Sequence, residues 1–156
     1  MGLVRIVRGT AHAPTATASY DAALAAAGVH NYNLVTVSSV VPADARVEVV
    51  GTAPDLGPVG EGLTVVQGRA TTDEGPAVAG LGWATGPEGG ILYEAAGTDR
   101  AAVRADVEDG LAAGKALREW TYADAGLELA AADPGTDSEY ATAVVLAVYG
   151  GSEPLC

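Results

Sequence analysis

Phenylalanine is absent from this 156-residue sequence, and aromatic residues make up only 5% of it. Hydrophobic residues nevertheless account for 49% of the chain, so the core must be built mainly from alanine, valine and leucine. Such small side chains bury little area each, at roughly 25 cal/mol per Å² of apolar surface. The length suffices for one compact core, and we expect association with other copies to add stability.

Lysine is almost absent as well, with Lys115 the only one, and 20 acidic residues face 8 basic ones for a net charge of −12. A field of this sign repels phosphate backbones, which argues against a nucleic-acid partner. An acidic surface with so little lysine suggests a cytosol of very high salt, where charge repulsion is screened within about 3 Å at 1 M. We therefore hypothesise a halophilic protein.

The single cysteine, Cys156, cannot form an internal disulfide, which fits a reducing compartment. No apolar run approaches the roughly 20 residues that span a bilayer, and the N-terminus is too short and too evenly charged for a signal peptide. We expect a cytoplasmic protein with no membrane partner. His12 and His30 have no third ligand at metal spacing, so no metal site is expected.

The first third of the chain predicts a strand, a helix and a second strand. Leu3–Val7 alternates weakly as a short strand, and Gly9–Thr17 is expected to be a loop. Ser19 is a candidate N-cap for the helix, which Gly28 would end. The β-branched run Asn33–Val41 then predicts one almost unbroken buried strand.

The rest of the chain predicts several strands around one long helix. This helix is expected over Thr98–Trp120 with Thr98 as its N-cap. Its apolar stripe starts at Val103 and Val107 and continues toward Leu117. Further strands are expected at Arg46–Val50, Leu63–Ala70, Ala77–Thr85, Ile91–Ala95, Leu127–Ala131 and Ala141–Tyr149. Mostly antiparallel strands with two separated helices indicate a layered α+β fold over residues 1–156 as a single domain.

Ser38 and Ser39 interrupt the apolar run with two adjacent hydroxyls. In the simpler interpretation they lie on opposite faces of a strand, and one of them faces solvent. In the alternative, the Ser39 hydroxyl attacks the Ser38 carbonyl and forms an ester. Elimination then breaks the chain and leaves dehydroalanine, which hydrolyses to a pyruvoyl group. That chemistry requires a well-positioned peptide bond, a donor for the oxyanion and polar neighbours, and composition alone favours the simpler interpretation.

Motifs around this serine pair bear on the choice between these two interpretations. They are Tyr20–Leu24, Gly28–Leu34 and Ser38–Pro42, followed later by Gly90–Glu94 with Gly97. In order and spacing they resemble the pyruvoyl-dependent arginine decarboxylases, which show Phe-Asp-x-Ala-Leu, then Gly-x-x-Asn-Tyr-Asn-Leu, then Ser-Ser-x-x-Pro. Because the resemblance extends over nearly the whole chain, self-cleavage becomes the favoured interpretation.

The resemblance implies that the chain is cut between Ser38 and Ser39 into 1–38 and 39–156. Ser39 then becomes the covalent pyruvoyl cofactor. The implied reaction converts L-arginine to agmatine and CO₂ through a Schiff base on that group. The implied fold is a four-layer αββα sandwich that assembles as homotrimers or dimers of trimers, with active sites between subunits.

Three more residues receive roles from the resemblance, and each also has a simpler interpretation. Asn33 matches an asparagine that assists cleavage and substrate placement, or it satisfies backbone groups at a strand entry. Glu94 matches the proton donor, or it is a solvated surface side chain. Asp21 matches the carboxylate that binds the substrate guanidinium, whose paired N–H donors suit a carboxylate. In the simpler interpretation, Asp21 interacts with a helix dipole.

The sequence also departs from the family pattern. Thr17 and Ala18 replace a Leu-Asn pair, and His30 stands where glycine is common. These changes leave cleavage plausible and bear mainly on substrate preference. Two alternatives therefore stay open: a pyruvoyl-dependent decarboxylase of another amino acid, such as histidine, and an uncleaved subunit that keeps the fold without catalysis.

The halophilic hypothesis predicts that the protein unfolds as salt is removed. The net charge of −12 then repels itself over longer distances, because the screening length grows from about 3 Å at 1 M salt to about 30 Å at 0.01 M. Thermal unfolding in a KCl series measures this. Stability that is undiminished in low salt would sink the hypothesis.

Overall fold

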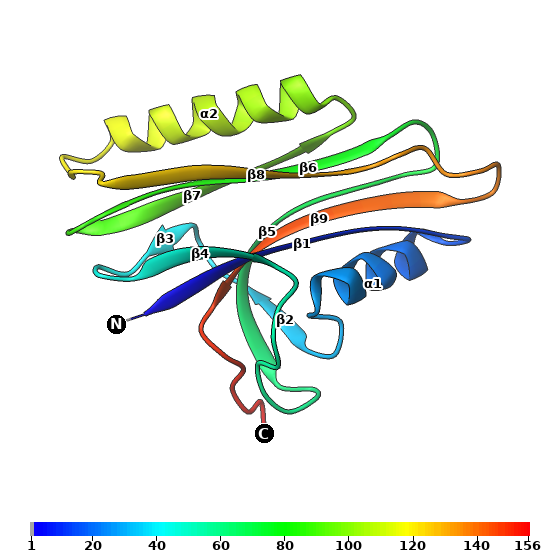
Figure 1. The fold of residues 1–156 in the computed structure, drawn as a ribbon, viewed down its shortest axis with the longest axis horizontal. Coiled ribbons are helices and arrows are strands. Elements are labelled where there is room, and N and C mark those ends of the chain that lie inside the picture. The colour runs from blue at the N-terminus through cyan, green and yellow to red at the C-terminus, as the bar shows by residue number, and fades with distance from the viewer. Residues whose placement is uncertain (1) are drawn as a thin grey trace.

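The computed structural model describes residues 2–156, which form two helices and nine strands. Figure 1 shows four layers: the helix α2 (Arg100–Ala116), a four-stranded sheet, a five-stranded sheet, and the helix α1 (Ala16–Ala27). This arrangement confirms the predicted α+β sandwich with mostly antiparallel strands. Neither helix within residues 2–156 is long and apolar enough to cross a membrane.

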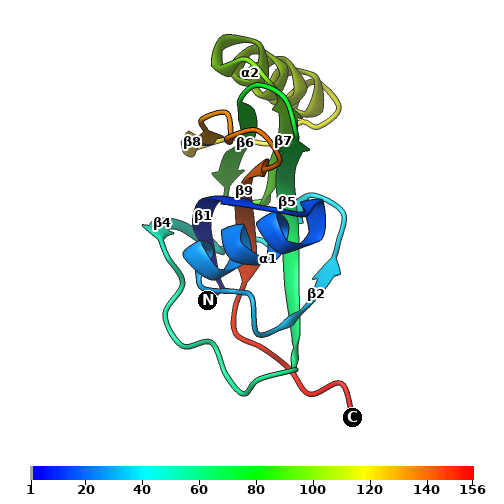
Figure 2. The same cartoon turned by 90° about the vertical axis from the view of Figure 1, so that its right-hand side faces the viewer.

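The five-stranded sheet has the order β2-β5-β9-β1-β4. Its strands are β1 (Leu3–Ala13), β2 (Asn33–Thr36), β4 (Arg46–Gly51), β5 (Gly62–Thr72) and β9 (Tyr140–Tyr149). The β1–β4 and β2–β5 pairs are parallel, whereas β9 runs antiparallel to both of its neighbours. Figure 2 shows β2 and β4 at opposite edges of this sheet, with α1 packed across its outer face.

The four-stranded sheet has the order β3-β7-β6-β8, and all its pairs are antiparallel. Its strands are β3 (Val40–Val41), β6 (Ala77–Gly86), β7 (Gly89–Gly97) and β8 (Asp124–Ala132). Glycines on β6 let α2 approach closely. A Cβ added at Gly82 would lie only 2.5 Å from Cγ1 of Val107, and one at Gly80 would lie 2.9 Å from Cγ1 of Val103.

Apolar side chains fill both the space between the sheets and the space under α1. As predicted, alanine, valine and leucine dominate these layers. The largest fully buried side chains are Ile6, Leu63, Leu81, Ile91, Leu92 and Leu146. Since few large side chains are available, packing depends on close approach between the layers.

The N-terminal prediction was wrong in two places. Gly9–Ala13 is not a loop, because β1 continues to Ala13 and pairs with β9 from Val4 to its end. Thr15, not Ser19, is the N-cap of α1, and its side chain accepts the Ala18 N–H. Ser19 is instead fully buried inside the helix, where its hydroxyl bonds Thr142 Oγ1 at 2.6 Å. Gly28 ends the helix at φ 81° as predicted.

The predicted strand Asn33–Val41 was also wrong as a single buried element. It divides into β2, on the edge of the five-stranded sheet, and β3, on the edge of the four-stranded sheet. Val35 and Val40 are 45% and 47% exposed. Periodicity could not detect the division, because a β-branched run satisfies the strand pattern in either sheet.

The long helix is shorter than predicted. Asp99 rather than Thr98 caps it, and it ends at Ala116. Val103 and Val107 are buried as expected, but Leu117 is 79% exposed. The buried face of α2 continues instead through glycines, against which a tyrosine ring of β7 packs.

Candidate active site

Ser38 and Ser39 lie outside the strands, in the short connection that crosses from β2 to β3. They open onto a cavity of about 290 Å³. The other lining residues are Val40, Ile91, Leu92, Tyr93, Glu94 and Arg118. The cavity therefore collects groups from the crossing, from β7 and from the segment after α2.

The backbone around the serine pair is held from two directions. Leu92 N–H donates to the Ser39 carbonyl at 2.9 Å, which ties the crossing to β7. Val40 N–H donates to the Ser38 carbonyl at 2.8 Å, and this bond between residues two apart closes a γ-turn around Ser39. The carbonyl that cleavage would attack thus already accepts a backbone hydrogen bond.

Glu94 reaches the serine pair because of how β7 alternates. Its neighbour Tyr93 points toward α2, where a Cβ added at Gly110 or Gly114 would lie 2.5 or 2.6 Å from the ring. Successive side chains of a strand point to opposite faces, so Glu94 points away from α2. The Ser39 hydroxyl donates to Glu94 Oε2 at 3.5 Å, and Glu94 remains exposed within the single chain.

Tyr149 fastens the other side of the crossing. Its hydroxyl donates to the Val40 carbonyl at 2.9 Å, which links the end of β9 to β3. Burial raises the pKa of Tyr149 to about 12, because the charged phenolate loses solvation there. The protonated form of Tyr149 is therefore the one that holds Val40.

The other two predicted residues lie elsewhere in the chain. Asn33 starts β2, where its side chain donates to the Gly60 carbonyl at 2.8 Å. Val37 lies four positions further along an extended stretch, which spans about 13 Å at 3.3 Å per residue. Asp21 is exposed on α1, and no α1 residue lines the cavity. One chain thus brings Ser38, Ser39 and Glu94 together but neither Asn33 nor Asp21.

Arg118 is a member of the cavity that the sequence did not identify. The signal that places it in the cavity is tertiary, since it depends on how α2 lies over β7. Among residues 2–156, no group of three His, Cys, Asp or Glu side chains is arranged to hold a metal ion.

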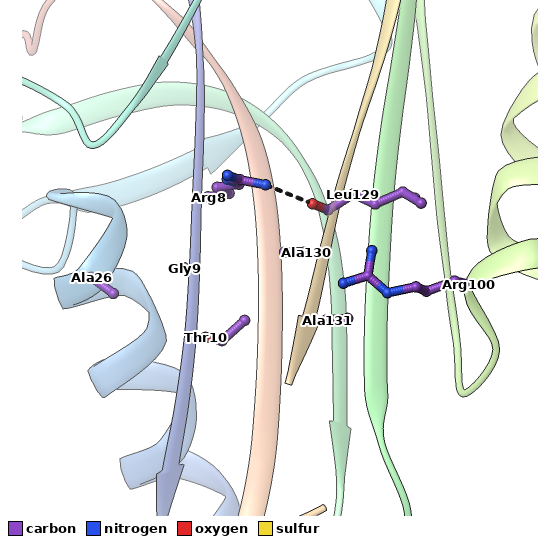
Figure 3. A pocket seen from close by; sticks show the side chains of 8 residues that line it. All are labelled: Arg8, Gly9, Thr10, Ala26, Arg100, Leu129, Ala130 and Ala131. Carbon is purple, nitrogen blue, oxygen red and sulfur yellow. Dashed lines mark hydrogen bonds between the residues drawn. The ribbon is translucent and has the colours of Figure 1, made fainter. Parts of the chain in front are cut away.

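A larger cavity, of about 370 Å³, lies beside β8, at the sheet edge opposite β3. Figure 3 shows Arg8 and Arg100 directed into it from β1 and from the start of α2. Arg8 donates to the Leu129 carbonyl at 3.2 Å and pairs with Glu128 at 3.5 Å. None of the predicted site residues lines this cavity.

A family model for pyruvoyl-dependent arginine decarboxylase matches residues 3–154 of the chain. The chain belongs to this family. It is 49% identical to a pyruvoyl-dependent arginine decarboxylase of Halobacterium salinarum over 160 aligned positions, which cover 99% of this chain and 98% of the relative. Relatives of the same name from Thermococcus sibiricus and Pyrococcus horikoshii are 35% and 39% identical, over 59% and 51% of this chain and 60% and 51% of their own lengths.

As a member of the pyruvoyl-dependent arginine decarboxylase family, the chain uses a covalent pyruvoyl group. The residues present fit that group. Ser39 can supply its carbon skeleton, and its backbone is fixed by Leu92 while its hydroxyl faces Glu94. The serine pair also lies at a cavity rather than inside a hydrogen-bonded ladder, so reactants can reach it.

The raised pKa of Tyr149 predicts a loss of stability in alkali. The unfolded chain deprotonates near the ordinary pKa of 10.0, and the folded chain only near 12. The Tyr149 contribution is therefore fully present below pH 10 and is lost as the pH rises toward 12. Chemical denaturation between pH 8 and 12 measures it, with Tyr149→Phe as the comparison. If the two proteins lose stability in parallel over that range, the assignment to Tyr149 is wrong.

Proposed function

We propose that this chain cuts itself between Ser38 and Ser39 and then decarboxylates L-arginine to agmatine and CO₂. The observation that carries the proposal is the Ser39 hydroxyl, 3.5 Å from Glu94 Oε2, at a cavity in a chain of this family. The relatives, which are pyruvoyl-dependent arginine decarboxylases by name, support arginine as the substrate.

Cleavage begins when Ser39 Oγ attacks the Ser38 carbonyl carbon and an ester replaces the peptide bond. The Val40 N–H, already 2.8 Å from that carbonyl oxygen, donates to the negative charge that develops there. Loss of the Ser39 Cα proton then expels the ester oxygen, which remains on Ser38 as a carboxylate. Water converts the resulting dehydroalanine to the ketone and releases ammonia.

Decarboxylation requires an electron acceptor and a proton. The pyruvoyl group supplies the carbonyl that accepts electrons from the departing carboxylate. Glu94, beside Ser39, holds the proton that replaces CO₂ at the substrate Cα. Asp21 receives the substrate guanidinium through paired hydrogen bonds, which orient the substrate relative to Glu94.

Residues of two chains complete this site in our proposal, in a homotrimer or a dimer of trimers. Asp21 and Asn33 lie outside the cavity of their own chain. The strands that flank Ser38 and Ser39 carry Val35 and Val40, which are 45% and 47% exposed. Exposed apolar side chains on both sides of the serine pair favour coverage by another copy. Size-exclusion chromatography with light scattering tests the assembly, and a monomer would contradict it.

The cellular location and salt conditions that we propose are those that the sequence predicts. We propose a cytoplasmic enzyme in a salt-rich cell, because 20 acidic and only 8 basic residues give the net charge of −12. The 49% identical relatives come from Halobacterium salinarum, which supports this proposal. The salt series described above tests it.

Three variants separate cleavage from decarboxylation. Ser39→Ala leaves a single intact chain on a denaturing gel, because the attacking hydroxyl is gone, whereas Ser38→Ala still gives two fragments. Glu94→Gln is also cleaved, since its amide oxygen still accepts a hydrogen bond, but trapped CO₂ falls at least about 100-fold because the proton donor is missing. Normal turnover by Glu94→Gln would remove the proton-donor role, and an intact wild-type chain would support the non-catalytic subunit.

Asp21→Asn weakens arginine binding, and we expect KM to rise about tenfold or more, because a hydrogen bond to a charged group contributes about 1.5–3 kcal/mol. Asp106→Asn, which removes an exposed carboxylate on α2, is the matched control. Assays with a panel of amino acids measure substrate choice in parallel. An unchanged KM counts against the guanidinium role, and CO₂ release from histidine alone would support the alternative substrate.

A further inference from the structure

Arg118 lines the cavity at Ser38 and Ser39, and the proposed reaction assigns it no role. It follows α2, and its guanidinium is held in place: Nη1 donates to the Gly114 carbonyl at 2.9 Å, and Cζ lies 5.4 Å from the centre of the Trp120 ring. Its side chain lines the cavity together with Ser38 and Ser39. A cationic side chain therefore lines the same cavity as the serine pair.

The charge of Arg118 has no carboxylate partner before cleavage. None of the three ion pairs found within residues 2–156 involves it. Glu94 is the only acidic side chain that lines the cavity, and it forms no ion pair with Arg118. A guanidinium has five N–H donors, so donation to Gly114 leaves most of this capacity unused.

Cleavage creates the missing partner. When the ester oxygen leaves, the neutral Ser38 carbonyl becomes a carboxylate with a full negative charge. We propose that Arg118 binds a carboxylate in this cavity, and that this carboxylate is the new C-terminus at Ser38. The inference depends on the self-cleavage proposed above. A planar guanidinium and a carboxylate match each other in geometry and charge.

The substrate also carries an α-carboxylate, but it fits this position less well. An ion pair to the group that leaves as CO₂ would be stronger in the ground state than in the transition state, which slows the reaction. The carboxylate of Ser38 persists through every turnover and loses nothing. Binding it also keeps the cut end away from the substrate.

The test compares how much Arg118 stabilises the cut and the uncut protein. Arg118→Gln is prepared in the self-cleaved enzyme and in the Ser39→Ala precursor, which lacks the new carboxylate. Loss of the hydrogen bond to Gly114 affects both forms equally. We expect the Tm to fall about 3–8 °C further in the cleaved form than in the precursor. Arg118→Lys, which keeps the charge but not the planar fork, should lie between.

The matched control is Arg104→Gln, which removes an equal charge from an exposed position on α2 that pairs only with Glu108. It should change both forms alike. Equal losses from Arg118→Gln in the cut and uncut proteins overturn the proposal. If that variant also binds arginine more weakly but agmatine normally, the carboxylate belongs to the substrate instead. If mass spectrometry shows that the wild-type chain stays intact, the proposed self-cleavage is wrong. That result is distinct from a failure of the Arg118 proposal.

Discussion

One crossing of the chain between the two sheets determines the architecture of the candidate active site. Val37 N–H still donates to Val65 in the five-stranded sheet at 3.1 Å, while the Ser39 carbonyl already accepts Leu92 N–H from the four-stranded sheet at 2.9 Å. A chain that changes sheets within three residues leaves its middle residue without a regular partner. That residue is Ser38, whose carbonyl turns to the Val40 N–H. The peptide bond that we propose is cut therefore lies outside the regular backbone pairing of both sheets.

Close packing elsewhere directs side chains to that crossing. Glycines at positions 110 and 114 of α2 make space for Tyr93. This contact fixes which side chains of β7 point toward α2, so Glu94 points toward the serine pair. The same helix ends just before Arg118, so the depth at which α2 packs also sets the position of the guanidinium. In a protein without phenylalanine, such glycine contacts replace the larger side chains that usually fix one layer against another.

Much of this fold could be predicted from the sequence, and the failures have physical causes. Alternation and turn residues identified the strands β4 to β9, and Gly28 correctly ended α1. Local patterns missed the extension of β1 through Ala13, because pairing with β9 overrides the weak strand preference of that segment. They also missed the division of residues 33–41, since both halves have the same β-branched composition. The structure places Ser39 and Glu94 together at one cavity, and Arg118 joins them only through the packing of α2.

The order of the strands has a consequence for how the molecule folds and refolds. Under the proposed cleavage, the fragment 1–38 keeps β1 and β2 in the five-stranded sheet, where β1 lies between β9 and β4 of the fragment 39–156. Neither fragment can leave without opening the sheet. Folding of the uncut chain is a reaction of one molecule, but reassembly after the cut requires two fragments to meet. The proposed cut would therefore make reassembly depend on protein concentration, because a cleaved protein that unfolds has lost the covalent connection that guided its first folding.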